Sequence, residues 1–276
     1  LDGNYPVGTG NVALGNTALD SNVSGGYNTA IGNLALTSCT SNYHTVVGSF
    51  AGQNLTTALA SGAIGAYALN SNTTGPYNYA FGNSALQVNT TGGYNTAIGS
   101  SALTANTTAS NNTAVGYQSA YSNTTGERNT AMGVQSLYTN TTGSFNSAFG
   151  RTALYYNTTG QQNVANGQDA LFSNTTGSYN VAIGKSALET NTTASENTAV
   201  GYKAGYANTT GAEIVAVGER ALTTNTTGNY NTALGRVALF LNTTGASNTA
   251  VGNNALRSNT TASNNTAVGY QAAYTN

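Results

Sequence analysis

The tripeptide Asn-Thr-Thr is the most frequent element of this sequence that could take part in chemistry. Asn-x-Thr is the acceptor for N-linked glycosylation in secreted proteins. The same tripeptide also favours a turn in which the side chains hydrogen-bond the backbone. Both interpretations stay open at this point. Twelve copies lie 17 residues apart, and their asparagines are the candidate glycosylation sites: Asn72, Asn89, Asn106, Asn123, Asn140, Asn157, Asn174, Asn191, Asn208, Asn225, Asn242 and Asn259.

Three pairs of tyrosines recur at longer intervals and are candidate surface contacts. They are Tyr117 with Tyr121, Tyr202 with Tyr206, and Tyr270 with Tyr274. Near each pair, a leucine that is common elsewhere in the chain is replaced by Ala120, Gly205 or Ala273. Aromatic packing that refills the lost leucine volume is the favoured interpretation. The alternative is that exposed tyrosines stack on sugars.

The chain has few residues that could catalyse a reaction or bind a metal ion. His44 is the only histidine and Cys39 the only thiol. A Cys-His pair needs a third, orienting group and a pocket before it can act as a nucleophile. One histidine and one cysteine do not make a zinc site. The few carboxylates are scattered, and the glycines follow no phosphate-loop spacing. We therefore expect no enzyme, no metal site and no cofactor.

The composition excludes several partners and still favours an ordered chain. Charged residues make up 5% of the 276 residues and the formal net charge is −1, so nucleic acid and anionic membranes are not expected as partners. Hydrophobic residues make up 39%, and 18 of the residues are tyrosine, which is unlike a disordered chain. No apolar run is long enough for a transmembrane helix. One cysteine cannot form an internal disulfide.

A repeat of 17 residues organises the sequence. Its consensus is Asn-Thr-Ala-φ-Gly-x-x-Ala-Leu-x-x-Asn-Thr-Thr-Gly-x-x, where φ is a large apolar residue, and we number its positions as columns 1 to 17. Glycine occupies column 5 in all sixteen units, and alanine occupies column 3 in fifteen. Such agreement indicates that every unit has nearly the same surroundings, as in stacked coils. The units begin at residues 11, 28, 44, 61, 78, 95, 112, 129, 146, 163, 180, 197, 214, 231, 248 and 265.

The repeat predicts an all-β fold, a parallel β-solenoid of about sixteen 17-residue coils. Glycine and Asn-Thr-Thr at fixed places disfavour a helix. Two short β-capable runs, Thr-Ala-φ and Ala-Leu, alternate with turn residues, so each coil is expected to hold two strands. Residues 1–60 hold the most degenerate units and are predicted to be degenerate N-terminal coils, a cap or a junction. Residues 61–276 are predicted to form the regular repeats.

The placement of charge predicts which columns face solvent. Beyond Asp2, all charged residues fall in columns 6, 7, 10, 16 and 17. Burial of a charge is costly, so these columns are expected on the surface. The other columns are expected to be buried, to form hydrogen-bonded ladders between coils, or to lie in tight turns. Asparagines of column 1, such as Asn95 and Asn112, are expected to hydrogen-bond to their copies in neighbouring coils.

Adjacent apolar columns raise the question of a second buried face. Ala97 and Ile98 are neighbours, as are Ala102 and Leu103. Because strand residues alternate between faces, regular strands would be apolar on both sides. Sister chains could then cover the outer side. A bend that sends both residues inward is the alternative.

The Asn-Thr-Ala-φ-Gly core resembles a known type of repeat. Residues 95–99 and 180–184 are similar to head repeats of YadA-like trimeric autotransporter adhesins, and also to repeats of bacteriophage tail-fibre shafts. The resemblance implies a left-handed β-roll, three chains packed side by side, and a surface that binds host matrix or cells. The unit of this chain is longer than the usual adhesin head repeat.

These observations favour a structural and adhesive fibre located outside the cell. The expected partners are copies of the same chain in a homotrimer or filament, and a carbohydrate or cell-surface ligand. Localisation on a cell surface, in a secreted filament or in a virion fibre is expected. One alternative is an ice-binding solenoid, since rows of threonine could order water, although adjacent threonines should face opposite ways. Another is a polysaccharide-active segment of a phage fibre.

Overall fold

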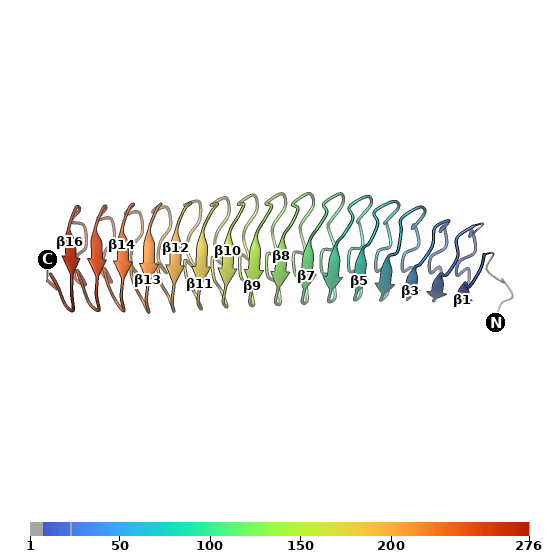
Figure 1. Cartoon of the computed structure of the whole chain (residues 1–276), viewed down its shortest axis with the longest axis horizontal. Coiled ribbons are helices and arrows are strands. Elements are labelled where there is room, and N and C mark those ends of the chain that lie inside the picture. The colour runs from blue at the N-terminus through green and yellow to red at the C-terminus, as the bar shows by residue number, and fades with distance from the viewer. Residues whose placement is uncertain (1–7, 23, 276) are drawn as a thin grey trace. The chain divides into compact units, whose positions relative to one another are not determined.

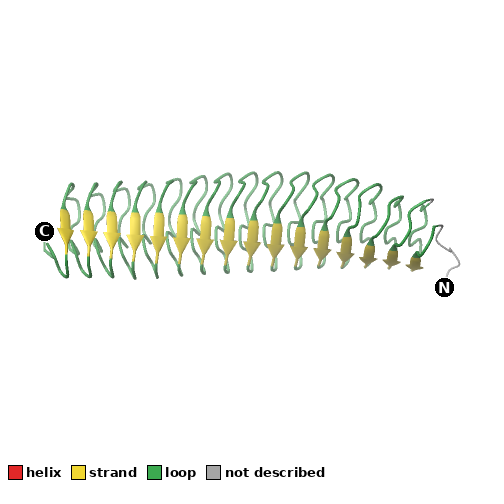
Figure 2. Ribbon diagram, in the orientation of Figure 1, coloured by secondary structure: helices red, strands yellow, loops and turns green. Residues whose placement is uncertain are grey.

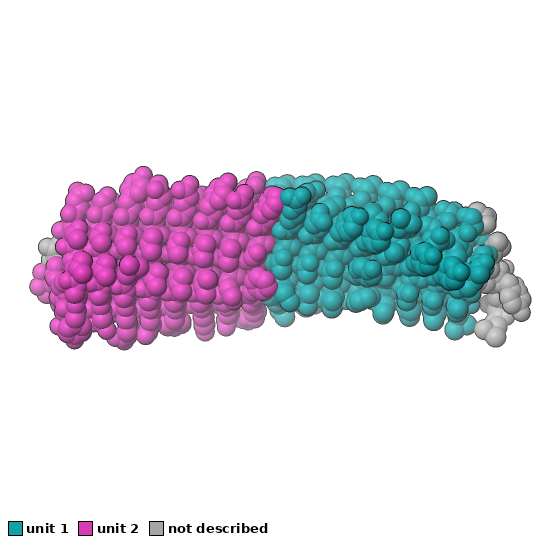
Figure 3. Space-filling view, viewed as in Figure 1, with its two compact units in different colours: residues 1–142 teal, residues 143–276 magenta. Residues whose placement is uncertain are grey.

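The computed structural model describes residues 8–22 and 24–275, and its fold is a parallel β-solenoid (Figure 1). The chain forms two compact units, Leu1–Thr142 and Gly143–Asn276, coloured separately in Figure 3. The described residues contain strands, turns and loops and no helix (Figure 2). Every strand has three residues and occupies columns 2 to 4 of one repeat. The predicted all-β fold class is therefore confirmed.

Among the described residues each unit holds eight strands, one from each coil. The first unit contains β1 (Val12–Leu14), β2 (Thr29–Ile31), β3 (Thr45–Val47), β4 (Gly62–Ile64), β5 (Tyr79–Phe81), β6 (Thr96–Ile98), β7 (Thr113–Val115) and β8 (Thr130–Met132). The second contains β9 (Ser147–Phe149), β10 (Val164–Asn166), β11 (Val181–Ile183), β12 (Thr198–Val200), β13 (Val215–Val217), β14 (Thr232–Leu234), β15 (Thr249–Val251) and β16 (Thr266–Val268).

Strands one repeat apart are hydrogen-bonded neighbours in parallel register. Ala97 of β6 pairs with Ala80 of β5 on one side and with Ala114 of β7 on the other. The ladder continues outside the strands, since the amide of Thr96 donates to the carbonyl of Asn112 at 2.8 Å. Each coil thus satisfies its backbone groups on the coils next to it, which is why a single coil would not be stable alone.

Column 5 requires glycine for two reasons. Gly99 has a φ of 132°, a conformation that side chains rarely allow. A Cβ atom at this residue would lie 2.5 Å from the carbonyl oxygen of Gly116 in the next coil. The same combination of conformation and close stacking explains why column 5 is invariant within the chain.

The prediction of a second strand in each coil, at the Ala-Leu run, is wrong. Columns 6 to 11 form a chain of turns, in which column 7 and column 9 have positive φ. Leu103 of column 9, for example, has a φ of 50°. Its amide still donates to the carbonyl of Ser119 in the next coil, at 3.0 Å. Left-handed residues between right-handed ones replace the strand and keep the hydrogen bonds between coils.

The core consists of small and medium apolar side chains from both halves of the coil. Ala97 of column 3 and Ala102 and Leu103 of columns 8 and 9 are completely buried. The positive φ of Leu103 interrupts the alternation of side chains, so Ala102 and Leu103 both point inward. A bend that sends both apolar residues inward, one of the two alternatives from the sequence, is therefore present at columns 8 and 9.

The predicted N-terminal cap is built like the coils that follow it, as far as it is described. Strands β1 to β4 pair in the same parallel register as the rest of the first unit. Residues 1–7 of the predicted cap lie outside the described residues. The boundary between the two compact units, after Thr142, does not coincide with the change in repeat regularity near residue 60.

Candidate functional site

Columns 2 and 4 form an exposed face on the sheet of each unit, which we call the outer sheet face. In most strands, column 3 is buried while columns 2 and 4 are exposed or half-buried; the exceptions are Ala13, which is half-buried, and Gly62, which is buried. The side chain of Ile98 is 40% exposed and that of Ile183 is also 40% exposed. The side chains of columns 2 to 4 thus alternate between the two faces of the sheet, and the outer face is apolar. This is the outcome predicted for regular strands.

The charged columns lie on the surface, as predicted. Among the described residues no Asp, Glu, Lys or Arg side chain is buried. The expectation for the uncharged columns is wrong for columns 2 and 4, because these columns are exposed and still carry no charge in any unit. The exposed side chains of column 4 are uncharged and, except for Asn166, apolar, and such a surface excludes water when it is covered.

The column 1 asparagines form the predicted ladder inside the coil. The side-chain oxygen of Asn78 accepts hydrogen bonds from the backbone amide of Asn95 at 3.0 Å and from its side-chain amide at 3.1 Å. Asn95 also donates to the carbonyl of Ala109. These asparagines are buried, and their polar atoms are paired within the solenoid.

The twelve asparagines of the Asn-Thr-Thr turns, in column 12, form a second internal ladder. The side-chain amide of Asn106 donates to the side-chain oxygen of Asn89 at 2.7 Å and to the carbonyl of Ala109 at 3.0 Å. All twelve candidate glycosylation residues are completely buried. The nitrogen that would carry a glycan is therefore enclosed and already bonded, which favours the turn interpretation over glycosylation of the folded chain.

The three tyrosine pairs lie on the surface of the turn segment. Tyr117, Tyr202 and Tyr270 are exposed, and Tyr121, Tyr206 and Tyr274 are half-buried. Refilling of leucine volume by tyrosine is wrong for the coil that contains Gly205. A Cβ at Gly205 would lie 3.0 Å from Leu188 and 3.6 Å from Ile214, so these two side chains occupy the space.

Column 10 contains a row of aromatic side chains that the sequence reasoning missed. Tyr121 stacks on Tyr138 with ring centres 5.2 Å apart, and Tyr155 stacks on Phe172 at 5.3 Å. The ammonium group of Lys203 lies 4.8 Å from the ring centre of Tyr206. Aromatic residues recur in column 10 of successive coils, and this recurrence is the signal in the sequence that predicts the row.

Cys39 and His44 lie near each other, in a buried polar cluster that also includes Ser41. The thiol of Cys39 donates to the carbonyl of Ser41 at 3.4 Å, and the hydroxyl of Ser41 lies 2.8 Å from Nε2 of His44. Burial raises the pKa of the Cys39 thiol and lowers the pKa of His44. Both groups are therefore held in their neutral forms.

The hydrogen bonds of His44 fix its proton on the wrong nitrogen for general-base catalysis. The backbone amide of Ser61 donates to Nδ1 at 3.1 Å, so the proton of the neutral ring is on Nε2. Nε2 then donates to the hydroxyl of Ser41, which itself donates to the carbonyl of Ala58. A base would have to accept the proton of Ser41, and this arrangement does the opposite.

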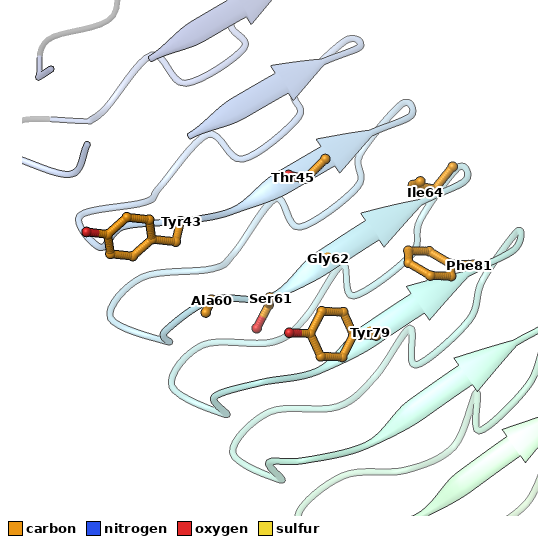
Figure 4. Close-up of a pocket in the computed structure, with 8 residues that line it drawn as sticks. All are labelled: Tyr43, Thr45, Ala60, Ser61, Gly62, Ile64, Tyr79 and Phe81. Carbon is orange, nitrogen blue, oxygen red and sulfur yellow. The ribbon is translucent and has the colours of Figure 1, made fainter. Parts of the chain in front are cut away.

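Two hollows open on the sheet side of the first unit, between the last residues of the coils and columns 1, 2 and 4. One, of about 190 Å³, is lined by Tyr43, Thr45, Ala60, Ser61, Gly62, Ile64, Tyr79 and Phe81 (Figure 4). The second, of about 470 Å³, is lined by Tyr77, Tyr79, Tyr94 and Thr96. Tyr79 belongs to both hollows. Between Asp20 and Glu127 the chain contains no Asp, Glu, Lys or Arg, so both hollows are uncharged.

Comparison with known proteins identifies no family for this chain. No protein-family model matches the chain, and no curated protein does. The resemblance to adhesin and tail-fibre repeats therefore rests on the repeat core alone. Within residues 8–22 and 24–275, His, Cys, Asp and Glu form no group of three that could hold a metal ion. The same residues contain no helix of the length and hydropathy needed to cross a membrane.

Proposed function

We propose that the chain is a segment of a structural, adhesive fibre outside the cell, in which copies of the chain pack side by side. Column 4 would make this contact. It carries an apolar residue in fifteen of the sixteen coils, exposed in ten and half-buried in five, and none of its residues is charged. We call it the apolar row; its most exposed members are Leu14, Ile64, Phe81, Ile98, Met132, Phe149, Ile183, Val217, Leu234 and Val268.

A second copy of the chain is the partner that this row fits best. The apolar residues repeat once per coil, at the roughly 4.8 Å spacing of parallel strands. A partner that covers the row in many coils needs the same spacing, and a copy of the chain has it. The stacked coils supply stiffness along the row, because each coil bonds to its neighbours through backbone and asparagine ladders.

Sedimentation of the full chain tests this proposal. We expect a homo-oligomer, and we expect Ile98→Lys to shift it toward monomer by placing a charge in the contact. The matched control is Ser100→Lys, two residues away in column 6, where Lys185 occurs naturally. The control should keep the oligomer. A wild-type chain that stays monomeric at all concentrations would contradict side-by-side packing.

An ice-binding role has one observation in its favour and remains the second candidate. Column 2 places threonines on the outer sheet face, as in Thr96, Thr113 and Thr130, which avoids the objection raised for adjacent threonines. The row is interrupted by Gly62 and Tyr79, so its surface is uneven. Thermal hysteresis in dilute solution would favour this role over the fibre.

A further inference from the structure

A break in the repeat creates a slot on the outer sheet face of the first unit. The coil that begins at residue 44 ends with Ala60 in column 17, and the coil that begins at residue 61 has Gly62 in column 2. Neighbouring coils have larger side chains at both places. Gly62 pairs with Thr45 on one side and with Tyr79 on the other. The missing side chains leave the hollow that is lined by these residues, and we call it the tyrosine slot.

Aromatic rings form the walls of the tyrosine slot. Tyr43 is 62% exposed and Tyr79 is 42% exposed, which leaves much of both rings open to a ligand. The ring of Tyr79 leans over the glycine, since a Cβ at Gly62 would lie 3.1 Å from its Cδ1 atom. Figure 4 shows the Tyr79 hydroxyl pointing toward Ser61, with Phe81 at the other end of the slot.

Three hydroxyl groups around the slot are available to a ligand. The hydroxyls of Tyr43, Thr45 and Tyr79 make no hydrogen bond to another described residue, whereas the hydroxyl of Ser61 donates to the carbonyl of Leu59. Apolar walls with a few hydroxyls that can donate or accept are the usual make-up of a site for a small polar ligand.

From this geometry we propose that the tyrosine slot binds one ring of a neutral glycan. The C–H face of a sugar ring would pack on the negatively polarised face of Tyr79, and its hydroxyls would bond to the free hydroxyls of the slot. The absence of charge between Asp20 and Glu127 favours a neutral sugar over an acidic one. At about 190 Å³ the slot is smaller than most ligand pockets, which suits one ring.

The second hollow extends the site to a neighbouring ring. It shares Tyr79 with the slot and adds Tyr77 and Tyr94, whose rings stack with centres 5.2 Å apart. Thr96 supplies a further hydroxyl. Because the two hollows follow one another along the coils, adjacent rings of a linear glycan could occupy them together. A linear oligosaccharide is therefore a better ligand than a single sugar.

This inference rests on the adhesive part of the proposed function, but it uses different columns from the contact between copies. The free hydroxyls of the slot, those of Tyr43, Thr45 and Tyr79, come from the last residue of one coil and from column 2 of two others. Only Ile64 and Phe81 belong to the apolar row. Loss of glycan binding and loss of self-association can therefore be separated by substitution.

The test uses the full chain and a panel of linear hexasaccharides, with binding followed by calorimetric titration and saturation-transfer NMR. The neutral probes are the hexamers of β-linked glucose, α-linked glucose, β-linked mannose and β-linked N-acetylglucosamine. The acidic probe is the hexamer of galacturonic acid. At least one neutral probe should bind saturably and more tightly than the acidic probe. If no neutral probe binds, or if the acidic probe binds as tightly, the inference is overturned.

Two substitutions to the repeat consensus place the binding in the slot. Gly62→Thr fills the floor and Tyr79→Thr removes a wall, and each should weaken binding about tenfold. The control Tyr230→Ala removes an exposed tyrosine of the second unit, and it should leave the affinity unchanged. Equal loss in the control would show non-specific binding to exposed tyrosines and would overturn the inference.

Sedimentation and melting curves of the same variants complete the test. Both threonine substitutions restore the common residue of column 2, so the fold should be kept, as circular dichroism can check. If glycan binding is lost while the oligomer is kept, only the slot has been changed, as we expect. If the wild-type chain binds glycan but is monomeric, the contact between copies is wrong and the tyrosine slot stands.

Discussion

The side-chain amide of Asn106 donates to the side-chain oxygen of Asn89, 17 residues earlier, across 2.7 Å. Asn123 donates in turn to Asn106 at 3.0 Å, so the amides form a continuous ladder through the interior of the first unit. A buried polar group is favourable only when it is paired, and between Asn72 and Asn123 the asparagines pair with their copies. Identical neighbours thus let the asparagines of this column be buried in consecutive coils, in addition to the bonds that each makes within its own turn.

Removal of one rung should be costly. Asn106→Ala deletes the donors to Asn89 and Ala109 and the acceptor of Asn123, and it leaves buried groups without partners. We expect a loss of about 3 kcal/mol in the free energy of unfolding. Urea denaturation followed by circular dichroism measures it. The control Thr108→Ala, two residues away and exposed, should change the stability by less than about 0.5 kcal/mol.

Alanine in column 5 should disrupt the stacking of coils. Gly99→Ala places a Cβ 2.5 Å from the carbonyl oxygen of Gly116, at a φ of 132° that alanine rarely adopts. The expected cost is at least about 3 kcal/mol, from backbone strain together with overpacking. The neighbouring Ser100→Ala serves as control. Equal thermal midpoints for the two variants would refute this explanation of the invariant glycine.

Glycine in column 7 should have the opposite effect. Ser101 has a φ of 58°, and its hydroxyl makes no hydrogen bond to another described residue. Ser101→Gly relieves the left-handed strain, and the gain exceeds the added entropy of the unfolded chain. We expect the variant to be more stable by about 0.5 to 1 kcal/mol. Ser101→Val, which introduces a branched residue, should be less stable than the wild type.

Burial of His44 should make the stability depend on pH near neutrality. Burial lowers its pKa in the folded chain, while the unfolded chain keeps the ordinary value near 6.5. Below about pH 6.5 the unfolded state binds the proton more readily, so stability falls as pH is lowered, by at most about 1.4 kcal/mol per unit. Urea midpoints between pH 7.5 and 5 measure this slope.

A variant that restores the repeat isolates the effect of the histidine. His44→Asn places in column 1 the residue that most other coils have there, and it removes the only histidine of the chain. The slope between pH 7.5 and 5 should then largely disappear. An unchanged slope would assign the pH dependence to other groups.

The repeat was sufficient to predict the stacking, the register and the exposure of the charged columns, but not the exposure of columns 2 and 4. A 17-residue period places Ala80, Ala97 and Ala114 in one environment, and the structure pairs them directly. Charges mark exposed columns because burial of a charge is costly. Asparagine ladders follow from the same register.

Other features of the structure could not be predicted from the 17-residue repeat. The Ala-Leu run was expected to be a strand, but Leu103 adopts a left-handed conformation that its residue type disfavours, because contacts between coils outweigh local preference. The tyrosine slot depends on side chains that are missing from one coil. A consensus describes what coils share and therefore hides an exception such as Gly62.

The central claim is that each coil is hydrogen-bonded to the coils 17 residues before and after it. Scalar coupling across hydrogen bonds, measured by NMR on the isotope-labelled full chain, tests this most directly. The amide nitrogen of Thr96 should couple to the carbonyl carbon of Asn112, and that of Gly99 to Phe81. Coupling of these amides to carbonyls three or four residues away would contradict the solenoid.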